Sequence, residues 1–186
     1  EHHGLLASPV DDLVLGGTPV VVADLHSSLP AVLAGARATG GARGPVRAVY
    51  VMTDGGALPL PYSRTAAALR GAGWLAGTVS AGQAWGGDVE AVSVHNALLA
   101  ARRILGADLI VLAQGPGNLG TDTPWGFSGV ACGDAVNAVA ALGGRAVACL
   151  RVSQADARAR HRGVSHHSLT AYGRVALAAA DVVVPA

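Results

Sequence analysis

The sequence predicts an α/β fold: a doubly wound, mainly parallel sheet of about six strands with helices on both faces, in three α/β/α layers. Short apolar runs alternate with longer helical patterns along the chain, as in successive β–α–β units. The runs lack the polar alternation of a half-exposed strand, as expected when both faces of a parallel sheet are covered. The 186 residues are enough for one such domain and too few for a closed eight-stranded barrel with its helices.

Six apolar runs are the predicted strands. In chain order they are Pro19–Leu25, Arg47–Thr53, Leu75–Ser80, Asp108–Ala113, Arg145–Arg151 and Asp181–Val184. Residues 1–17 precede the first run and are predicted to be an irregular lead-in, and residues 18–186 are predicted to form the single domain.

Five segments between these runs are the predicted helices. They are Leu29–Ala38, Ser63–Ala72, Val89–Leu105, Ser128–Leu142 and Ser168–Ala179. Ser63 and Asp88 stand where a residue caps the N-terminus of the second and the third helix, and Gly106 follows the third. The helix Ser128–Leu142 is rich in Ala and Gly, so it could pack closely on the sheet or on a second subunit in a homodimer.

The overall composition excludes several classes of protein. Hydrophobic residues make up 51% of the chain and charged residues 13%, which excludes an intrinsically disordered chain. The net charge of +1 provides no field that would gather nucleic acid or an anionic membrane surface. No apolar run approaches the roughly 18 residues that a membrane-spanning helix needs. Cys132 and Cys149 have neither a CxxC motif nor metal-ligand spacing, which favours two buried thiols in a reducing, cytoplasmic location.

Polar side chains collect after the predicted strands, at the edge where an open parallel sheet binds its ligands. His26 follows the first strand and Asp54 the second, while His166 and His167 lie beyond the fifth. The opposite edge carries mainly glycine turns. The carboxyl edge of the sheet is therefore the predicted site, and these four side chains are the candidates for proton transfer there. Helix caps and turns would by themselves account for part of this asymmetry.

A glycine-rich loop after the fourth strand is the main predicted ligand-binding segment. Backbone amides of such a loop and the start of the helix at Ser128 would hold an anion. Residues 115–120 match the dinucleotide pattern GxGxxG, but that pattern requires the helix to start among the glycines, and residues 121–126 intervene here. The alternative is a loop whose glycines only allow the chain to turn. The candidate ligand contacts are Gln114, Gly115, Gly117, Asn118, Gly120, Thr121, Thr123 and Trp125.

A basic segment, residues 153–163, follows the fifth strand. Its basic and imidazole side chains make it a candidate lid that folds over an anionic ligand, with Arg160 or Arg162 in contact with that ligand. A solvated basic loop is an equally good interpretation. The side chains in question are Arg158, Arg160, His161 and Arg162.

A metal site is the weaker interpretation of the same polar residues. His26 with Asp54, Asp88 and one of the two adjacent histidines could form a mixed histidine and carboxylate site. No HxH, HxxxH or HxxE spacing supports it. Adjacent side chains point apart in an extended segment, so His166 and His167 are not expected to ligate one ion together. No metal ligand is assigned on these grounds, and no cofactor can be named.

Long motifs in five segments resemble one protein family. The segments are Val20–Ser27, Val49–Leu60, Gln114–Thr121, Trp125–Gly129 and Arg162–Arg174. Over them the chain is similar to a bacterial family catalogued as domain of unknown function 3866. The resemblance runs over almost the whole chain and implies an intact protein with an additional N-terminal segment. It implies no activity, cofactor or catalytic residue.

Three functions are compatible with these patterns. The leading hypothesis is a protein that binds a small anionic metabolite, phosphorylated or nucleotide-like, at the carboxyl edge of the sheet, as an enzyme with histidine acid–base chemistry. The second is a non-catalytic ligand-sensing or oligomeric scaffold domain. The third is a metal-dependent hydrolase, which stoichiometric metal analysis would test.

Overall fold

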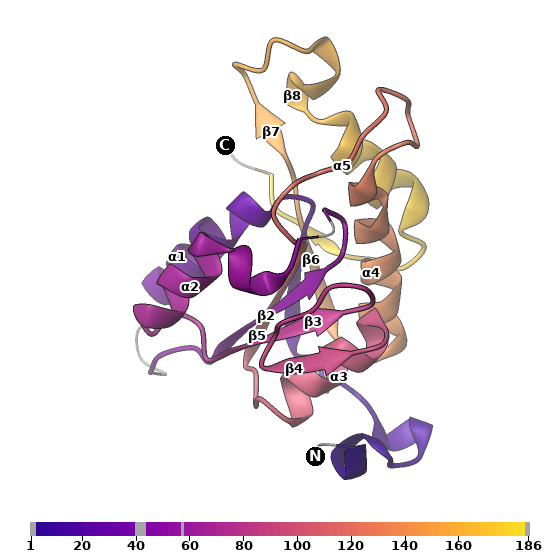
Figure 1. Ribbon diagram of the computed structural model, residues 1–186. Coiled ribbons are helices and arrows are strands. Elements are labelled where there is room, and N and C mark those ends of the chain that lie inside the picture. The colour runs from indigo at the N-terminus through magenta and orange to yellow at the C-terminus, as the bar shows by residue number, and fades with distance from the viewer. Residues whose placement is uncertain (1–2, 40–43, 57, 185–186) are drawn as a thin grey trace.

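The structure is a computed structural model that describes residues 3–39, 44–56 and 58–184, and its centre is a seven-stranded parallel sheet (Figure 1). The strand order across the sheet is β4-β3-β2-β5-β1-β6-β9. The α/β fold and the parallel sheet predicted from the sequence are thus confirmed. The strands are β1 (Pro19–Ala23), β2 (Ala48–Thr53), β3 (Gly77–Ala81), β4 (Val89–Ala91), β5 (Leu109–Gln114), β6 (Arg145–Cys149) and β9 (Asp181–Val182).

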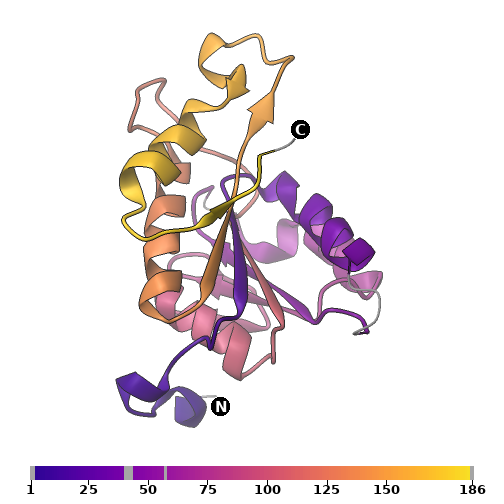
Figure 2. The ribbon, with the colours of Figure 1, turned by 180° about the vertical axis from the view of Figure 1, so that it is seen from behind.

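The helices lie on both faces of this sheet, as the view from behind shows (Figure 2). Two of them cover one face and two cover the other. A short fifth helix, α5, lies beside the fourth and continues into a π-helical turn, Ala171–Val175. The helices are α1 (Leu29–Thr39), α2 (Arg64–Gly71), α3 (Val94–Arg103), α4 (Ala131–Ala141) and α5 (His166–Thr170).

Alternate residues of each strand supply the two halves of the core. In β2, Tyr50 and Met52 are buried against α1 and α2, while Val49 and Val51 are buried on the face of α3 and α4. Such alternation follows from the two-residue repeat of a strand. Because both sets are apolar, polar and apolar residues do not alternate along the strand, as predicted from the sequence for a strand covered on both faces.

The chain reverses its direction of travel across the sheet between β1 and β5, which are neighbours. The connection through α1 runs from β1 toward the β4 edge, and the connection through α4 runs from β5 toward the β9 edge. The carboxyl ends of β1 and β5 therefore face a crevice at a topological switch point, where sheets of this kind bind ligands.

The predicted helix Val89–Leu105 is wrong in its first part. Val89–Ala91 is strand β4, which pairs with β3, and α3 begins at Val94 with Ser93 as its N-cap. Asp88 caps nothing, because its carboxylate accepts hydrogen bonds from the Thr78 backbone N–H (2.9 Å) and hydroxyl (3.0 Å). Pairing with a neighbouring strand, which a local pattern does not reveal, decided this segment.

Two further elements differ from the predictions. The two ends of the segment predicted as a loop, residues 153–163, pair as the antiparallel strands β7 (Val152–Ser153) and β8 (Gly163–Val164). The last helical segment starts at His166 and ends at Val175, earlier at both ends than predicted. Asn137 of α4 stops it, because its Oδ1 accepts from the backbone N–H groups of Leu177 (2.7 Å) and Ala178 (3.1 Å).

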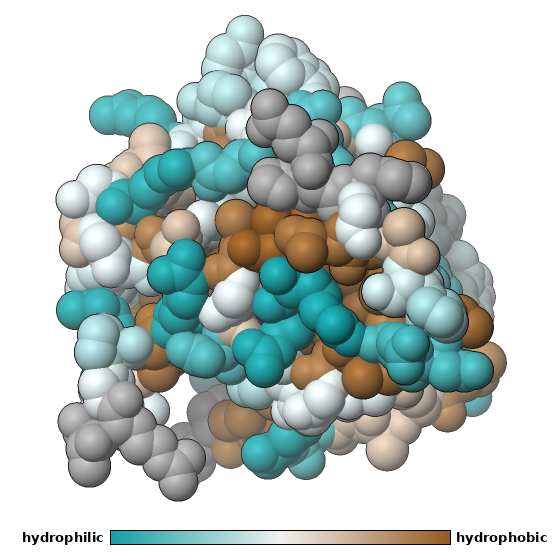
Figure 3. All heavy atoms as spheres, turned by 90° about the horizontal axis from the view of Figure 1, so that it is seen from below, coloured by the Kyte–Doolittle hydropathy of each residue, from teal (hydrophilic) through white to brown (hydrophobic). Residues whose placement is uncertain are grey.

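The predicted lead-in contains two 3-10 turns, His3–Leu6 and Val10–Asp12, and its end is anchored in the domain. Leu15 is fully buried in the core and its N–H donates to the Leu142 carbonyl (2.7 Å). The face seen from below mixes hydrophobic and hydrophilic side chains (Figure 3). Within the part of the chain that the structure describes, no helix is long and apolar enough to cross a membrane.

Candidate functional site

A cavity of about 640 Å³ lies at the carboxyl edge of the sheet. One wall is the glycine-rich loop, residues 115–127, which follows β5. The other wall comes from the lobe, residues 150–165, which carries β7 and β8 and stands at the top of Figure 1, and from the start of α5. Leu25, just beyond β1, also lines it. The cavity therefore lies beside the switch point of the sheet.

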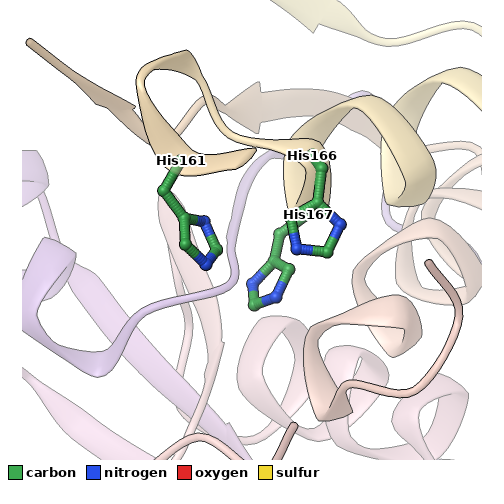
Figure 4. A group of neighbouring side chains, drawn as sticks. All are labelled: His161, His166 and His167. Atoms are coloured by element: carbon green, nitrogen blue, oxygen red, sulfur yellow. The ribbon is translucent and has the colours of Figure 1, made fainter. Parts of the chain in front are cut away.

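Three histidines converge on this cavity (Figure 4). His161 ends a 3-10 turn of the lobe, and His166 and His167 open α5. The ring centroids of His166 and His167 are 4.5 Å apart, and each lies 4.9–5.0 Å from that of His161. One ligand nitrogen of each ring lies within 4.8 Å of the other two.

The expectation that His166 and His167 point apart is wrong. It assumed an extended segment, but both residues belong to the first turn of α5. Ser165 caps this turn by accepting from the His167 backbone N–H at 3.2 Å. The helical backbone holds the two rings beside each other and next to His161.

Two of the three imidazoles are oriented by a hydrogen bond from Nδ1. Nδ1 of His161 lies 2.7 Å from the Ser165 hydroxyl, and Nδ1 of His167 lies 3.3 Å from a carboxylate oxygen of Asp24. The ring of His167 also stacks on Phe127 at a centroid distance of 3.9 Å. Nε2 of His166 is buried and has no hydrogen-bond partner among the residues that the structure describes.

The surroundings favour the neutral form of the three imidazoles. Burial, followed by the neighbouring histidines and arginines, lowers the pKa of His167 to about 4. The pKa values of His161 and His166 are also lowered, first by burial and then by arginines of the lobe. Burial raises the pKa of Asp24. The ring nitrogens that face the cavity are therefore available as acceptors.

Three arginines, Arg151, Arg158 and Arg160, line the same cavity. Arg151 and Arg158 both pair with Asp156, at 3.3 and 2.9 Å. Arg160 pairs with Asp122 at the tip of the glycine-rich loop and so joins the two walls. Among the lining residues that the structure describes, Asp122 is the single carboxylate against these three cations.

The four predicted proton-transfer residues do not form one group. His26 turns onto the face of α1 and α2, where its ring nitrogens bond the hydroxyls of Tyr50 (2.9 Å) and Ser63 (2.7 Å). Asp54 lines a separate cavity of about 330 Å³ beyond the end of β2. Since β5 separates β1 from β2 in the sheet, residues that follow β2 do not reach the lobe that follows β6.

The mixed metal grouping considered from the sequence is not assembled either. Asp88, its third member, pairs with Arg70 at 2.5 Å and accepts from Thr78. Among the residues that the structure describes, the grouping with metal-ligand spacing is that of the three histidines. Of the four predicted proton-transfer residues, His166 and His167 are thus the two that the fold brings together.

Half of the predicted loop contacts line the large cavity: Asn118, Gly120, Thr121 and Thr123. Their side chains also hold the loop itself together. The Ser128 hydroxyl donates to Asn118 Oδ1 (2.9 Å), and the Thr121 and Thr123 hydroxyls lie 3.0 Å apart. Ser128, predicted as the start of the helix, instead begins a 3-10 turn before α4, and its hydroxyl is bonded to the loop.

The other predicted contacts lie elsewhere. The Gln114 amide donates to the Asp24 carbonyl at 2.5 Å, while its Oε1 is buried without a partner beside the smaller cavity. Gly115 and Gly117 approach the segment after β2, and Trp125 is exposed. Arg160 lines the large cavity, whereas Arg162 is exposed and does not.

Asp24 and Arg151 were missed by sequence reasoning. Both stand at the end of a predicted strand, Pro19–Leu25 and Arg145–Arg151, and were counted with the apolar run. A charged residue inside an apolar run could have identified them, because a charged side chain at the buried end of a strand needs a partner. In the structure Asp24 faces His167, and Arg151 faces Asp156.

The fold and the cavity define an α/β protein with a histidine- and arginine-lined cavity at the switch point of a parallel sheet. Residues 3–186 match the model of the family described as Protein of unknown function (DUF3866). The chain therefore belongs to this family, as its motifs predicted. No curated protein and no solved structure matches the chain.

Proposed function

We propose that this protein binds a small anionic metabolite, phosphorylated or nucleotide-like, in the cavity between the glycine-rich loop and the lobe. The observation that carries this proposal is the set of three arginines that line a cavity containing one carboxylate. Guanidinium groups bind phosphate and carboxylate oxygens through paired hydrogen bonds, which are about twice as strong as neutral ones.

The size and position of the cavity support the proposal. Its volume of about 640 Å³ lies within the range of small-molecule sites. It stands at the carboxyl edge beside the crossover of β1 and β5, the usual ligand position in such sheets. The arginines of the lobe, rather than the helix start at Ser128, would hold the anion, because Ser128 already bonds Asn118 and Leu119.

The histidines supply the chemistry of the proposed site. With Asp24 ionised, its carboxylate accepts from Nδ1 of His167 and leaves Nε2 of that ring as the acceptor. A neutral imidazole oriented by a carboxylate is suited to take a proton from a ligand or to ligate a metal ion. His167 was predicted for this role together with His26 and Asp54, and in the proposed site Asp24 is its partner instead of those two residues.

A binding screen with matched variants tests the proposal. Inorganic phosphate, pyrophosphate, sugar phosphates and nucleotides are titrated by calorimetry at low ionic strength. We expect Arg160→Gln and Arg158→Gln to weaken the best ligand tenfold or more, since a hydrogen bond to a charged group contributes about 1.5–3 kcal/mol. Arg162→Gln, an exposed neighbour outside the cavity, should change affinity less than twofold.

Two results would contradict this assignment. One is that none of these anions binds. The other is that a bound anion loses as much affinity in Arg162→Gln as in Arg160→Gln. Added salt should weaken binding of the anion, because ions screen the attraction between exposed charges and the Debye length is only about 10 Å at 0.1 M.

The scaffold alternative has less support. One face of α4, with Gly133, Ala135 and Ala138, is buried within the chain, and Gly133 packs against Ala171 and Val175. A homodimer and a cytoplasmic location stay predictions, which sedimentation and localisation experiments would test.

A further inference from the structure

We propose that His161, His166 and His167 bind one divalent transition-metal ion of the zinc class, with an open coordination position toward the cavity. One ligand nitrogen of each ring lies within 4.8 Å of the other two. The rings project on the same side of the lobe and α5, as Figure 4 shows. This inference does not rest on the proposed anion, because the three side chains can bind an ion in its absence.

The spacing of the three rings suits a single ion. Zinc binds imidazole nitrogen at about 2.0–2.1 Å, so the nitrogens of a tetrahedral site lie about 3.4 Å apart. The three ring centroids lie 4.5–5.0 Å apart, so small side-chain rotations would bring one nitrogen of each ring to this spacing. The ligands come from two segments joined by residues 162–165, so the backbone already holds them together.

Hydrogen bonds from the opposite ring nitrogens orient two of the ligands. Asp24 bonds Nδ1 of His167 and Ser165 bonds Nδ1 of His161, which leaves the other nitrogen of each ring free. A carboxylate behind a histidine is a common device in metal sites, where it fixes the tautomer and raises the basicity of the ligand. Asp24 lies far from His167 in the sequence and is 4% exposed, so the fold buries a carboxylate behind this ring.

A buried nitrogen without a partner is the second indication. Nε2 of His166 is inaccessible and makes no hydrogen bond. Buried polar atoms are paired in the great majority of cases, and an unpaired one is a candidate contact for a ligand or an ion. Stacking on Phe127 accounts for the position of the His167 ring, but it provides no partner for Nε2 of His166.

The cavity decides the class of the site. All three histidines line the cavity. The fourth coordination position of a bound ion, which no protein side chain fills, would therefore open into the cavity. Three protein ligands with one open position are typical of catalytic rather than structural zinc sites. Arg151 and Arg160 line the same cavity, and an anion or hydroxide in the open position would offset their repulsion of a bound cation.

Metal titration of the tag-free protein tests the site. The protein is treated with a chelator, dialysed into a phosphate-free buffer and titrated with Co²⁺ and Zn²⁺. We expect one Co²⁺ per chain, with the visible absorption of a four- or five-coordinate ion, and its displacement by Zn²⁺. His161→Ala and His166→Ala should each weaken Co²⁺ binding at least tenfold, whereas His95→Ala, an exposed histidine of α3, should leave it unchanged.

Asp24→Asn separates orientation from ligation. It keeps all three histidines, so the stoichiometry should stay at one ion, while affinity falls about 10- to 100-fold. The proposal is overturned if the parent protein takes up no stoichiometric Co²⁺, or if His95→Ala weakens uptake as much as His166→Ala. Circular dichroism of each variant shows whether it folds. If His166→Ala does not fold, His166→Gln is titrated in its place. Uptake of Co²⁺ without binding of any anion would contradict the proposed function alone.

Discussion

Asp24 shows how burial changes the meaning of a single residue. The residue is 4% exposed directly after β1, with His167 as partner. A carboxylate in that position is expensive to bury unless it is paired. Its presence therefore marks the site more sharply than the exposed polar residues of the neighbouring loops do.

His26 leads to a prediction about pH. Burial lowers its pKa, and both ring nitrogens bond neighbours, Tyr50 and Ser63. In the unfolded chain His26 has an ordinary pKa of about 6.5, so it binds a proton more readily there than in the folded chain. The contribution of His26 to stability is present above that value and is lost as the pH falls toward the lowered pKa.

Urea unfolding at pH 7 and pH 5 measures this effect. We expect His26→Gln, which keeps a polar side chain but cannot titrate, to lose less stability between the two pH values than the parent protein loses. His95→Gln, an exposed position, should follow the parent. If His26→Gln and the parent protein lose the same amount of stability between pH 7 and pH 5, the prediction is refuted.

At the scale of elements, two helix caps are built alike but placed differently. Ser63 caps α2 by accepting from the Ala66 N–H at 2.9 Å, and its hydroxyl also bonds His26. Ser93 caps α3 through the Asn96 N–H at 3.2 Å and stands exposed. The first hydroxyl therefore has a tertiary role that the second lacks.

Alanine substitution should separate these roles. Loss of either cap costs about 1 kcal/mol. Ser63→Ala also leaves a part-buried imidazole nitrogen of His26 unpaired, for a further cost of about 1 kcal/mol. Denaturant unfolding should therefore place Ser63→Ala below Ser93→Ala in stability, and the opposite order would show that the bond to His26 contributes nothing.

The contact between α4 and the π-helical turn gives a second prediction at this scale. A Cβ on Gly133 would lie 2.4 Å from the Ala171 carbonyl oxygen and 2.5 Å from Val175 Cβ. Gly133→Ala should therefore destabilise by about 1–3 kcal/mol through overpacking. In α1, a Cβ on Gly35 meets nothing within 4 Å, so Gly35→Ala should stabilise by about 0.5–1 kcal/mol. Thermal melts should show opposite shifts, and shifts of one sign would contradict the described packing.

On the scale of the whole molecule, the site joins segments from both ends of the chain. Asp24 follows β1, the glycine-rich loop follows β5, and the histidines lie beyond β6. The strand order makes β1 the neighbour of both β5 and β6, so these segments share one edge. A ligand held by all of them would bind the folded state and not the unfolded chain.

This linkage predicts stabilisation by metal. A ligand specific for the folded state at one hundred times its Kd raises the free energy of unfolding by about 2.7 kcal/mol. Zn²⁺ should therefore raise the melting temperature of the parent protein and leave that of His161→Ala nearly unchanged. Chelator should reverse the shift, and an equal shift in both proteins would point to binding elsewhere.

Much of the fold was predictable because its signals are local. The strand runs and most helix positions follow from hydrophobic periodicity, caps and glycine stops, which act between residues close in the chain. The α/β class, the parallel sheet and the carboxyl edge as the place of a cavity follow from that alternation alone. The family was likewise recognisable from its motifs.

The grouping of the side chains was decided by the tertiary structure. His26 and His167 both follow the predicted pattern, yet one turns to Tyr50 and the other to Asp24. Strand order, the early start of α5 and the pairing of β4 are settled by contacts between distant segments, which leave no local period in the sequence. The chain by itself thus determined which edge would carry the cavity, and only packing determined which residues line it.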